Sequence, residues 1–140
     1  MKLQTYLNFD GNTREAFEFY AKLFNGKIIA MMTYADMPAG EEGCPPEISN
    51  LILHARVDFG DQRLMATDAT PHHPYKGMTG AYVVTEIADP AEADRVFKAL
   101  AEKGEIEMPI QETFWAHRYG ITKDRFGVQW MVNCVKPEFA

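Results

Sequence analysis

The feature that most constrains this chain is an internal repeat. The segment 59–65 (FGDQRLM) shares an F-G-x-Q pattern with 126–131 (FGVQWM), and a helical pattern lies upstream of each copy. Four positions of the first helical pattern match four of the second at an offset of 77: Glu15, Ala16, Tyr20 and Leu23 correspond to Glu92, Ala93, Phe97 and Leu100. A chain that repeats its element order in this way is expected to build two similar modules.

Each helical pattern has start and stop signals. It begins at a residue that can cap a helix and ends before a glycine: Asn12 and Gly26 in the first copy, Asp89 and Gly104 in the second. The two F-G-x-Q segments lie 67 residues apart, so the first copy carries 77 − 67 = 10 more residues than the second. A Gly-, Pro- and Glu-rich loop at 36–46 accounts for this surplus.

The remaining segments alternate as β-strands do. They are 3–9, 27–34, 50–59, 62–68, 80–87, 106–110, 116–123 and 127–135. The order is βαβββ twice, which predicts an α+β fold: two tandem βαβββ modules that form a curved mixed sheet around a cleft. We expect a single domain, 1–140, with a first module at 1–70, including a loop at 36–49, and a second module at 78–136.

Strand faces indicate where a ligand would bind. One face of the third strand is apolar (Leu51, Leu53, Ala55 and Val57), whereas the other is mixed (Asn50, Ile52, His54 and Arg56). The last strand alternates in the same way, with Val128, Trp130, Val132 and Cys134 opposite Gln129, Met131 and Asn133. The apolar faces suit the helices, and the mixed faces suit a semi-polar cavity.

Charge and hydropathy exclude several partner classes. The net charge is −6, with no Lys/Arg cluster, which argues against nucleic acid and anionic membranes. No apolar stretch approaches the roughly 18 residues of a membrane span. The N-terminal segment lacks the pattern of a secretory signal, so we expect a cytoplasmic protein in which Cys44 and Cys134 are reduced.

Several short motifs resemble a known family. They are Phe19-Tyr20, Leu23-Phe24-Asn25-Gly26, Leu53-His54-Ala55, Leu64-Met65 with Asp68, Phe114-Trp115, Arg118-Tyr119-Gly120, Asp124, Phe126-Gly127 and Trp130. Together with the paired modules, they resemble the vicinal oxygen chelate superfamily (glyoxalase, bleomycin resistance and dioxygenase proteins), and most closely its PhnB-like branch. The resemblance covers nearly the whole chain and implies a homodimer with clefts between modules.

In metal-dependent members of that superfamily, each module supplies ligands to a divalent cation. Alignment on the helix and hairpin motifs puts Thr5, Tyr82 and Met131 at three ligand positions. Such metals prefer imidazole and carboxylate, so the usual metal chemistry is not expected. PhnB-like sequences also carry a demethylubiquinone methyltransferase label, but the first strand ends in Asp10-Gly11-Asn12 without a glycine-rich turn.

Six side chains are candidates for binding a small organic molecule: Thr5, Tyr82, Trp115, Gln129, Met131 and Asn133. Alternation and the family alignment place Tyr82, Gln129, Met131 and Asn133 on the cavity side. The alternative is that these side chains pack in the core or at an interface and do not contact a ligand.

Histidine and aspartate residues form a second candidate set. His54, Asp68 and His117 are catalytic candidates, and Asp68, His72, His73 and His117 are candidates for a rearranged metal site. The competing interpretations are hydrogen-bonded structural histidines, a surface loop at 71–74, and an Asp68 side chain that bonds the backbone of Ala69 or Thr70.

The sequence therefore predicts a small-molecule-binding PhnB-like homodimer without the usual metal-chelating site and without a cofactor. The alternative is a metal-dependent lyase, isomerase or dioxygenase that uses the rearranged His/Asp site with a divalent metal. A partner-binding dimer without chemistry is the third possibility.

Overall fold

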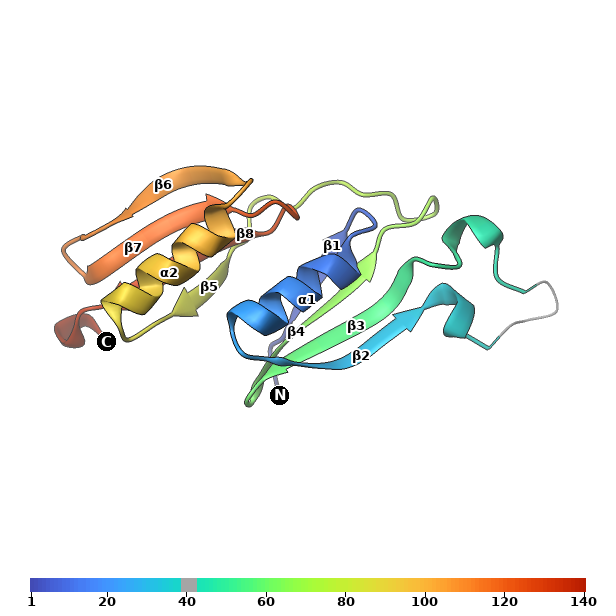
Figure 1. The fold of residues 1–140 in the computed structure, drawn as a ribbon, viewed down its shortest axis with the longest axis horizontal. Helices are drawn as coiled ribbons and strands as arrows, with labels where there is room; N and C mark the ends of the chain where they lie inside the picture. The colour runs from blue at the N-terminus through green and yellow to red at the C-terminus, as the bar shows by residue number, and fades with distance from the viewer. Residues whose placement is uncertain (39–42) are drawn as a thin grey trace. The chain divides into compact units, whose positions relative to one another are not determined.

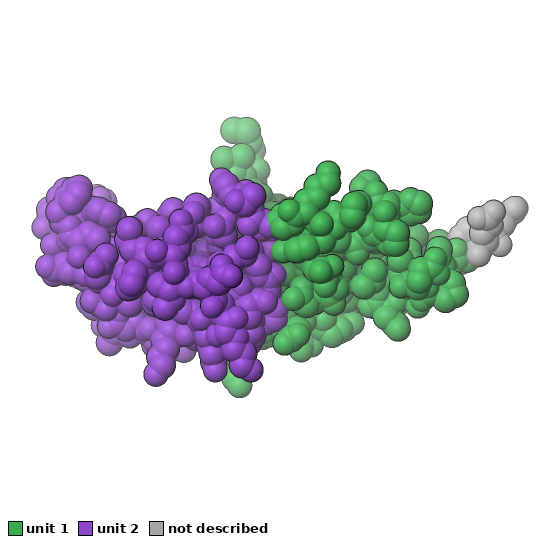
Figure 2. Space-filling view, turned by 90° about the horizontal axis from the view of Figure 1, so that it is seen from above, with its two compact units in different colours: residues 1–77 green, residues 78–140 purple. Residues whose placement is uncertain are grey.

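The computed structural model describes residues 1–38 and 43–140, and the chain divides into two units, 1–77 and 78–140 (Figure 2). Each unit is described by itself. The loop predicted at 36–49 includes residues 39–42, which lie outside the described residues; short 3-10 helices at Tyr34–Asp36 and Pro46–Ile48 flank them. The assignment of both modules to one domain stays a prediction.

The first unit follows the predicted order. It contains β1 (Thr5–Phe9), α1 (Thr13–Leu23), β2 (Lys27–Thr33), β3 (Ile52–Phe59) and β4 (Gln62–Asp68). The strands form a sheet in the order β1-β4-β3-β2, in which β1 pairs parallel to β4 and the other pairs are antiparallel.

The second unit repeats this arrangement. It contains β5 (Val83–Glu86), α2 (Pro90–Ala101), β6 (Glu105–Gln111), β7 (Ala116–Lys123) and β8 (Gln129–Val135), and a 3-10 helix (Pro137–Phe139) follows. The sheet order is β5-β8-β7-β6, with β5 parallel to β8. The α+β class and the two tandem βαβββ modules are thus confirmed.

One helix covers one face of each sheet, as Figure 1 shows. Below α1 lie buried side chains such as Phe9, Ala55 and Val57, and below α2 lie Trp130 and Val132. Burying these apolar faces against the helices drives each module to fold. The helix of each unit does not cover the opposite face of its sheet, and polar side chains lie on that face.

The third strand departs from strict alternation. Ile52, expected on the mixed face, is buried at 2% exposure with Ala55 and Val57. The register explains this, because Met32 pairs with His54 and the next residue of β2 pairs with Ile52, which skips a residue of β3. Such a bulge shifts the side chains beyond it to the other face.

The helix ends also differ from expectation. Asn12 makes no side-chain cap bond, whereas Asp89 accepts a bond from Glu92 N at 3.0 Å. After each helix, the residue with left-handed backbone geometry is not the glycine that was expected to end the helix. It is the residue before that glycine, Asn25 (φ 55°) or Lys103 (φ 58°). The glycines are required for close approach instead, as the contacts of Gly104 show below.

No helix in the described part of the chain has the length and apolar character needed to cross a membrane.

Candidate ligand-binding site

The open face of the second sheet brings together four of the six predicted binding residues. Along β8, Trp130 and Val132 are buried on the α2 side, and Gln129, Met131 and Asn133 alternate with them and are half-buried. Tyr82 directly precedes β5, the strand beside β8. We call this surface, with Tyr119 and Ile121 of β7, the second open face.

A hydrogen-bonded pair spans this face. Tyr82 Oη donates to Glu107 Oε2 at 3.0 Å and lies 3.2 Å from Oε1. Tyr82 and Glu107 belong to opposite edges of the sheet, which lie about 14 Å apart in a flat four-stranded sheet. Since side chains stand roughly perpendicular to a sheet, their contact indicates that the second open face is concave.

Glu107 is a site residue that the sequence reasoning missed. Ile106 pairs with Thr122 and Met108 with Ile121, so Glu107 is the extra residue of a β-bulge. Bulges re-aim a side chain, and here the carboxylate reaches Tyr82. The pattern around 106–110 contains no signal for this bulge.

The hydrogen bond to Glu107 raises the pKa of the Tyr82 phenol above its ordinary value of 10.0, with smaller contributions from burial and from the Glu107 charge. A hydrogen bond from the Gln129 side chain acts in the opposite direction. Tyr82 therefore remains a neutral hydrogen-bond donor at physiological pH and is unsuited to act there as a phenolate base.

Two amide oxygens on the same face have no hydrogen-bond partner among the described residues. Gln129 Oε1 and Asn133 Oδ1 are buried and accept no hydrogen bond from the described residues. Buried polar atoms are nearly always paired, because leaving one unpaired costs about 1–3 kcal/mol. These oxygens are therefore candidate acceptors for donors of a ligand.

Aromatic and sulfur contacts lie beside the amides. Tyr119 Oη is 3.5 Å from Met131 Sδ, and the Tyr119 ring packs edge-on against Trp115 with centroids 5.0 Å apart. Tyr119 also pairs with Asn133 across β7 and β8. Trp115 is thus linked to Met131 through Tyr119, a second residue that the sequence reasoning missed.

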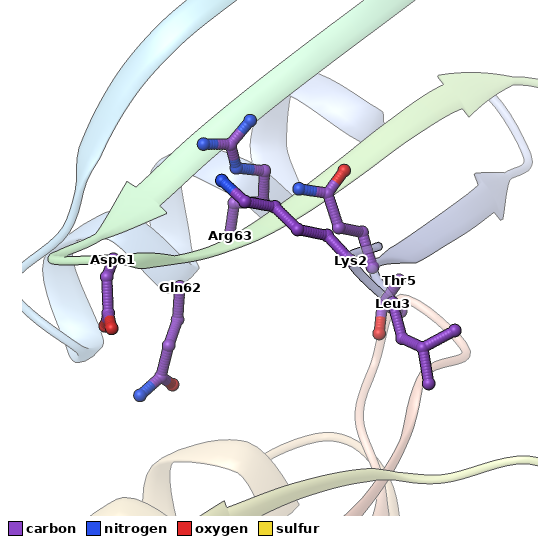
Figure 3. Close-up of a pocket in the computed structure, with 7 residues that line it drawn as sticks. Lys2, Leu3, Thr5, Asp61, Gln62 and Arg63 are labelled. Carbon is purple, nitrogen blue, oxygen red and sulfur yellow. The ribbon is translucent and has the colours of Figure 1, made fainter.

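Thr5, the sixth predicted residue, lies elsewhere. Its register partner is Leu64, so it shares the face of buried Leu7 and Phe9 that α1 covers, whereas Tyr6 lies on the opposite face. Alignment on the helix motif put Thr5 at a ligand position, whereas the register of β1 places it on the α1 side. Thr5 lines a separate pocket of about 350 Å³ at the start of β4 (Figure 3).

Asp68 has a structural role. Its Oδ1 accepts from Thr13 N at 3.0 Å and Thr13 Oγ1 at 2.7 Å, and its Oδ2 accepts from Ile52 N at 2.8 Å. The expected bonds to the backbone of Ala69 or Thr70 do not form. Buried at 3% exposure, the carboxylate joins the start of α1 to β3 and β4.

The four histidines lie on β3, in the loop after β4 and on β7. His54 Nδ1 lies 3.0 Å from Tyr6 Oη, and the two rings stack. His72 and His73 are exposed in the loop after β4, where the His73 backbone bridges to Thr70. His117 is exposed on β7 of the second unit.

The donor set does not fit a chelated divalent cation. Thr5, Tyr82 and Met131, at the positions implied by the resemblance, offer neither imidazole nor carboxylate. Within residues 1–38 and 43–140, no group of three or more His, Cys, Asp or Glu side chains is placed to hold a metal.

Comparisons with known proteins identify the family. The family model described as 3-demethylubiquinone-9 3-methyltransferase matches residues 1–133. The protein YjdN of Escherichia coli (strain K12) is 35% identical over 147 aligned residues, covering 99% of this chain and 98% of the relative. The chain belongs to this PhnB-like family.

Solved structures of similar proteins agree with this PhnB-like assignment. The crystal structure of protein PA1353 from Pseudomonas aeruginosa is 42% identical and has a TM-score of 0.88, over 96% of this chain and 98% of that one. A putative 3-demethylubiquinone-9 3-methyltransferase, PhnB protein, from Bacillus cereus is 26% identical with a TM-score of 0.78, over 95% and 98% of the two chains. Family membership establishes the fold here. It does not establish the reaction or the ligand, because a shared fold hosts many chemistries.

Proposed function

We propose that this PhnB-like protein binds a small organic molecule on the second open face, without a chelated metal. The observation that carries the proposal is the pair of unpartnered acceptors, Gln129 Oε1 and Asn133 Oδ1, beside an apolar surface. The two residues flank Met131 on β8, and the Trp115–Tyr119 pair extends the apolar surface. Binding sites commonly combine an apolar wall with a few oriented polar groups.

The same atoms define the chemistry of the ligand. Two amide oxygens require N–H or O–H donors, and Met131 with its aromatic neighbours favours a flat, apolar body. Glu107 adds a negative charge at the edge of the face, although it already accepts from Tyr82. The expected ligand is therefore a neutral or cationic aromatic compound with amino or hydroxyl groups.

Methyl transfer, which the family description names, is not part of the proposal. The turn between β1 and α1, Asp10-Gly11-Asn12, contains one glycine and not the glycine-rich loop by which a nucleotide-like cofactor approaches the backbone. The buried Asp68 carboxylate already occupies Thr13 N at the start of α1. These residues do not fit such a cofactor.

A fragment screen tests the binding proposal. Aromatic amines, amides and phenols are screened by ligand-observed NMR, and the hits are titrated against the wild-type chain and Met131→Glu. The charge should abolish binding, whereas Ile29→Glu, at an exposed position on β2, should leave it unchanged. Hits that bind Met131→Glu as tightly as wild type would overturn the proposal, as would a screen without hits.

Metal content tests the second part of the proposal. Elemental analysis of protein purified without a histidine tag should find less than stoichiometric Ni, Zn, Fe and Mn. Chelator should leave Tm unchanged, since removal of a bound ion would lower it. Stoichiometric metal, or a chelator-dependent fall in Tm, would instead favour the rearranged Asp68 and histidine site.

A homodimer and a cytoplasmic location also stay predictions. The resemblance to the superfamily implies the homodimer. Light scattering coupled to size-exclusion chromatography should give twice the chain mass of 15.9 kDa.

A further inference from the structure

We propose that the pocket at the start of β4 binds a small oxyanion, a phosphate or carboxylate group, through Lys2 and Arg63. The pocket has a volume of about 350 Å³ and belongs wholly to the first unit. Its lining residues are Lys2, Leu3, Gln4, Thr5, Asp61, Gln62 and Arg63. It is separate from the second open face and does not depend on the function proposed there.

Arg63 has hydrogen-bonding capacity that the protein does not use. Its Nε atom is buried and has no hydrogen-bond partner in the part of the chain that the structure describes. The nearest carboxylate, Asp58, lies 3.8 Å from Nε, which is beyond hydrogen-bonding distance. A guanidinium with an unpaired buried donor gains free energy when an acceptor arrives.

Asp58 is already engaged by another arginine. Arg56 donates from Nε to Asp58 Oδ1 at 2.7 Å and from a terminal nitrogen to Oδ2 at 2.5 Å, which is the bidentate geometry that carboxylates favour. Two arginines therefore share one carboxylate. The single negative charge of Asp58 leaves one positive charge on Arg56 and Arg63 uncompensated.

Lys2 adds a second cation next to Arg63. In Figure 3 the Lys2 and Arg63 side chains extend to the same side of the β4 ribbon, whereas Asp61 extends to the other side. The Gln4 amide is a neutral group of the lining, whereas the Gln62 side chain extends to the same side as Asp61 (Figure 3). The lining thus holds two cations and one carboxylate, a net positive charge in a chain of net charge −6, and a positively charged pocket attracts anions from solution.

An oxyanion suits this set of donors. Arginine binds carboxylate and phosphate through parallel N–H···O bonds, and lysine supplies a compact second charge. The two ligand sources share the same chemistry at the pocket, namely a small group with two or more negatively polarised oxygens. Separate titrations with phosphate and acetate distinguish them.

Amide NMR on the full chain tests the proposal. Inorganic phosphate or sodium acetate is titrated at constant ionic strength, with sodium chloride as the reference. Saturable shifts confined to residues 2–5 and 61–63 are expected with at least one of the two oxyanions. Tighter binding of phosphate assigns a phosphoryl group, and tighter binding of acetate assigns a carboxylate.

Charge-matched variants make the test specific. Arg63→Gln should weaken binding at least tenfold and Lys2→Gln about threefold. Arg14→Gln, which removes an equal charge from an exposed position on α1, should bind as wild type does. Shifts spread evenly over surface cations, or equal affinity in Arg63→Gln, would overturn the proposal, as would the absence of saturable shifts with both oxyanions.

Discussion

The two modules share one element order but satisfy their buried backbone groups with different carboxylates. In the first module Asp68 lies at the end of β4 and accepts from Thr13 and Ile52. In the second, Asp124 lies in the turn before β8, where Oδ1 accepts from Phe126 N and Val128 N at 2.9 Å each.

The difference follows from the length of the last hairpin. In the first module Phe59 pairs with Gln62, so only two residues form the turn. In the second, Lys123 pairs with Gln129, and five residues lie between them. The longer turn leaves N–H groups that a side chain must satisfy, and Asp124 satisfies two of them. A repeated fold thus does not require repeated stabilising contacts.

The open faces differ as well. That of the first sheet carries the charges of Arg56, Asp58 and Arg63, where Asp58 is the ion-pair partner of both arginines, whereas that of the second carries neutral amides around Met131. The same architecture therefore presents two chemically different surfaces, and we propose a different class of ligand for each.

Removing the two carboxylates should give the largest effects. Asp124→Ala removes the acceptor of two backbone N–H groups and of the Trp130 indole, since Trp130 Nε1 donates to Asp124 Oδ2 at 2.8 Å, and we expect a loss of about 4 kcal/mol in the free energy of unfolding. For Asp68→Ala we expect about 3 kcal/mol, because Thr13 Oγ1 can reorient.

Urea denaturation measures both losses. Both tryptophans, Trp115 and Trp130, lie in the second unit, so their fluorescence follows that module, and hydrogen exchange follows the first. Asp124→Ala should open the second module first and Asp68→Ala the first module first. Equal loss of protection in both modules for either variant would contradict this comparison.

The next largest effect should be the difference in stability between alanine substitutions of Gly26 and Gly104, the glycines that follow the two helices. A Cβ at Gly104 would lie 2.1 Å from the backbone oxygen of Lys123, whereas a Cβ at Gly26 would lie 2.5 Å from the Phe59 ring, with the Asp58 oxygen at 2.9 Å. A ring can move more readily than a strand backbone. We therefore expect Gly104→Ala to cost about 3 kcal/mol and Gly26→Ala about half of that, measured by urea denaturation. The reverse order would show that β7 yields more easily than the Phe59 side chain.

Alanine substitutions of the two predicted helix caps, Asp89 and Asn12, should show a smaller difference in stability. Asp89 accepts from Glu92 N, so Asp89→Ala should destabilise the chain by about 1 kcal/mol. Asn12 forms no cap bond, and its Oδ1 is buried without a partner in the described residues. Asn12→Ala should therefore stay within about 0.5 kcal/mol of wild type in thermal denaturation. A loss as large as that of Asp89→Ala would show that Asn12 caps α1 in solution.

The last comparison concerns ionisation at the second open face. Because Glu107 raises the pKa of Tyr82 above 10.0, Glu107→Gln should lower this pKa toward its ordinary value. The raised pKa means that the contribution of Tyr82 to stability is present in full below pH 10 and is lost as the pH rises through the folded-state pKa.

NMR of tyrosine-labelled protein across the alkaline range measures this shift. Tyr6, whose pKa burial raises in the first unit, serves as the internal control and should titrate unchanged in Glu107→Gln. An unchanged Tyr82 titration in the variant would show that Glu107 does not hold the phenol in solution.

Much of the fold could be predicted from the sequence. The periodicity of each segment placed β4 and β7 at their observed bounds, and the other strands to within three residues at either end. The alternation along β8 also separated buried Trp130 from half-buried Gln129 and Met131. These features are local, because side-chain period and turn chemistry depend on neighbours in the chain.

The candidate site depended partly on contacts that no local pattern encodes. Glu107 reaches Tyr82 only because a bulge in β6 and the curvature of the sheet bring opposite edges together. Asp68 bonds to Thr13 across 55 residues of sequence, so a carboxylate from β4 pairs with the first N–H group of α1. Alignment on the helix motif put Thr5 at a ligand position, and only the register of β1 places it on the α1 side.

The sequence by itself determined the repeat, the family and the buried face of β8, since these follow from periodicity and short motifs. Only the tertiary structure decided which carboxylates are structural, which amide oxygens lack partners and which arginine is left uncompensated. These properties depend on the distances between atoms remote in sequence, and the packing of each helix on its sheet fixes those distances.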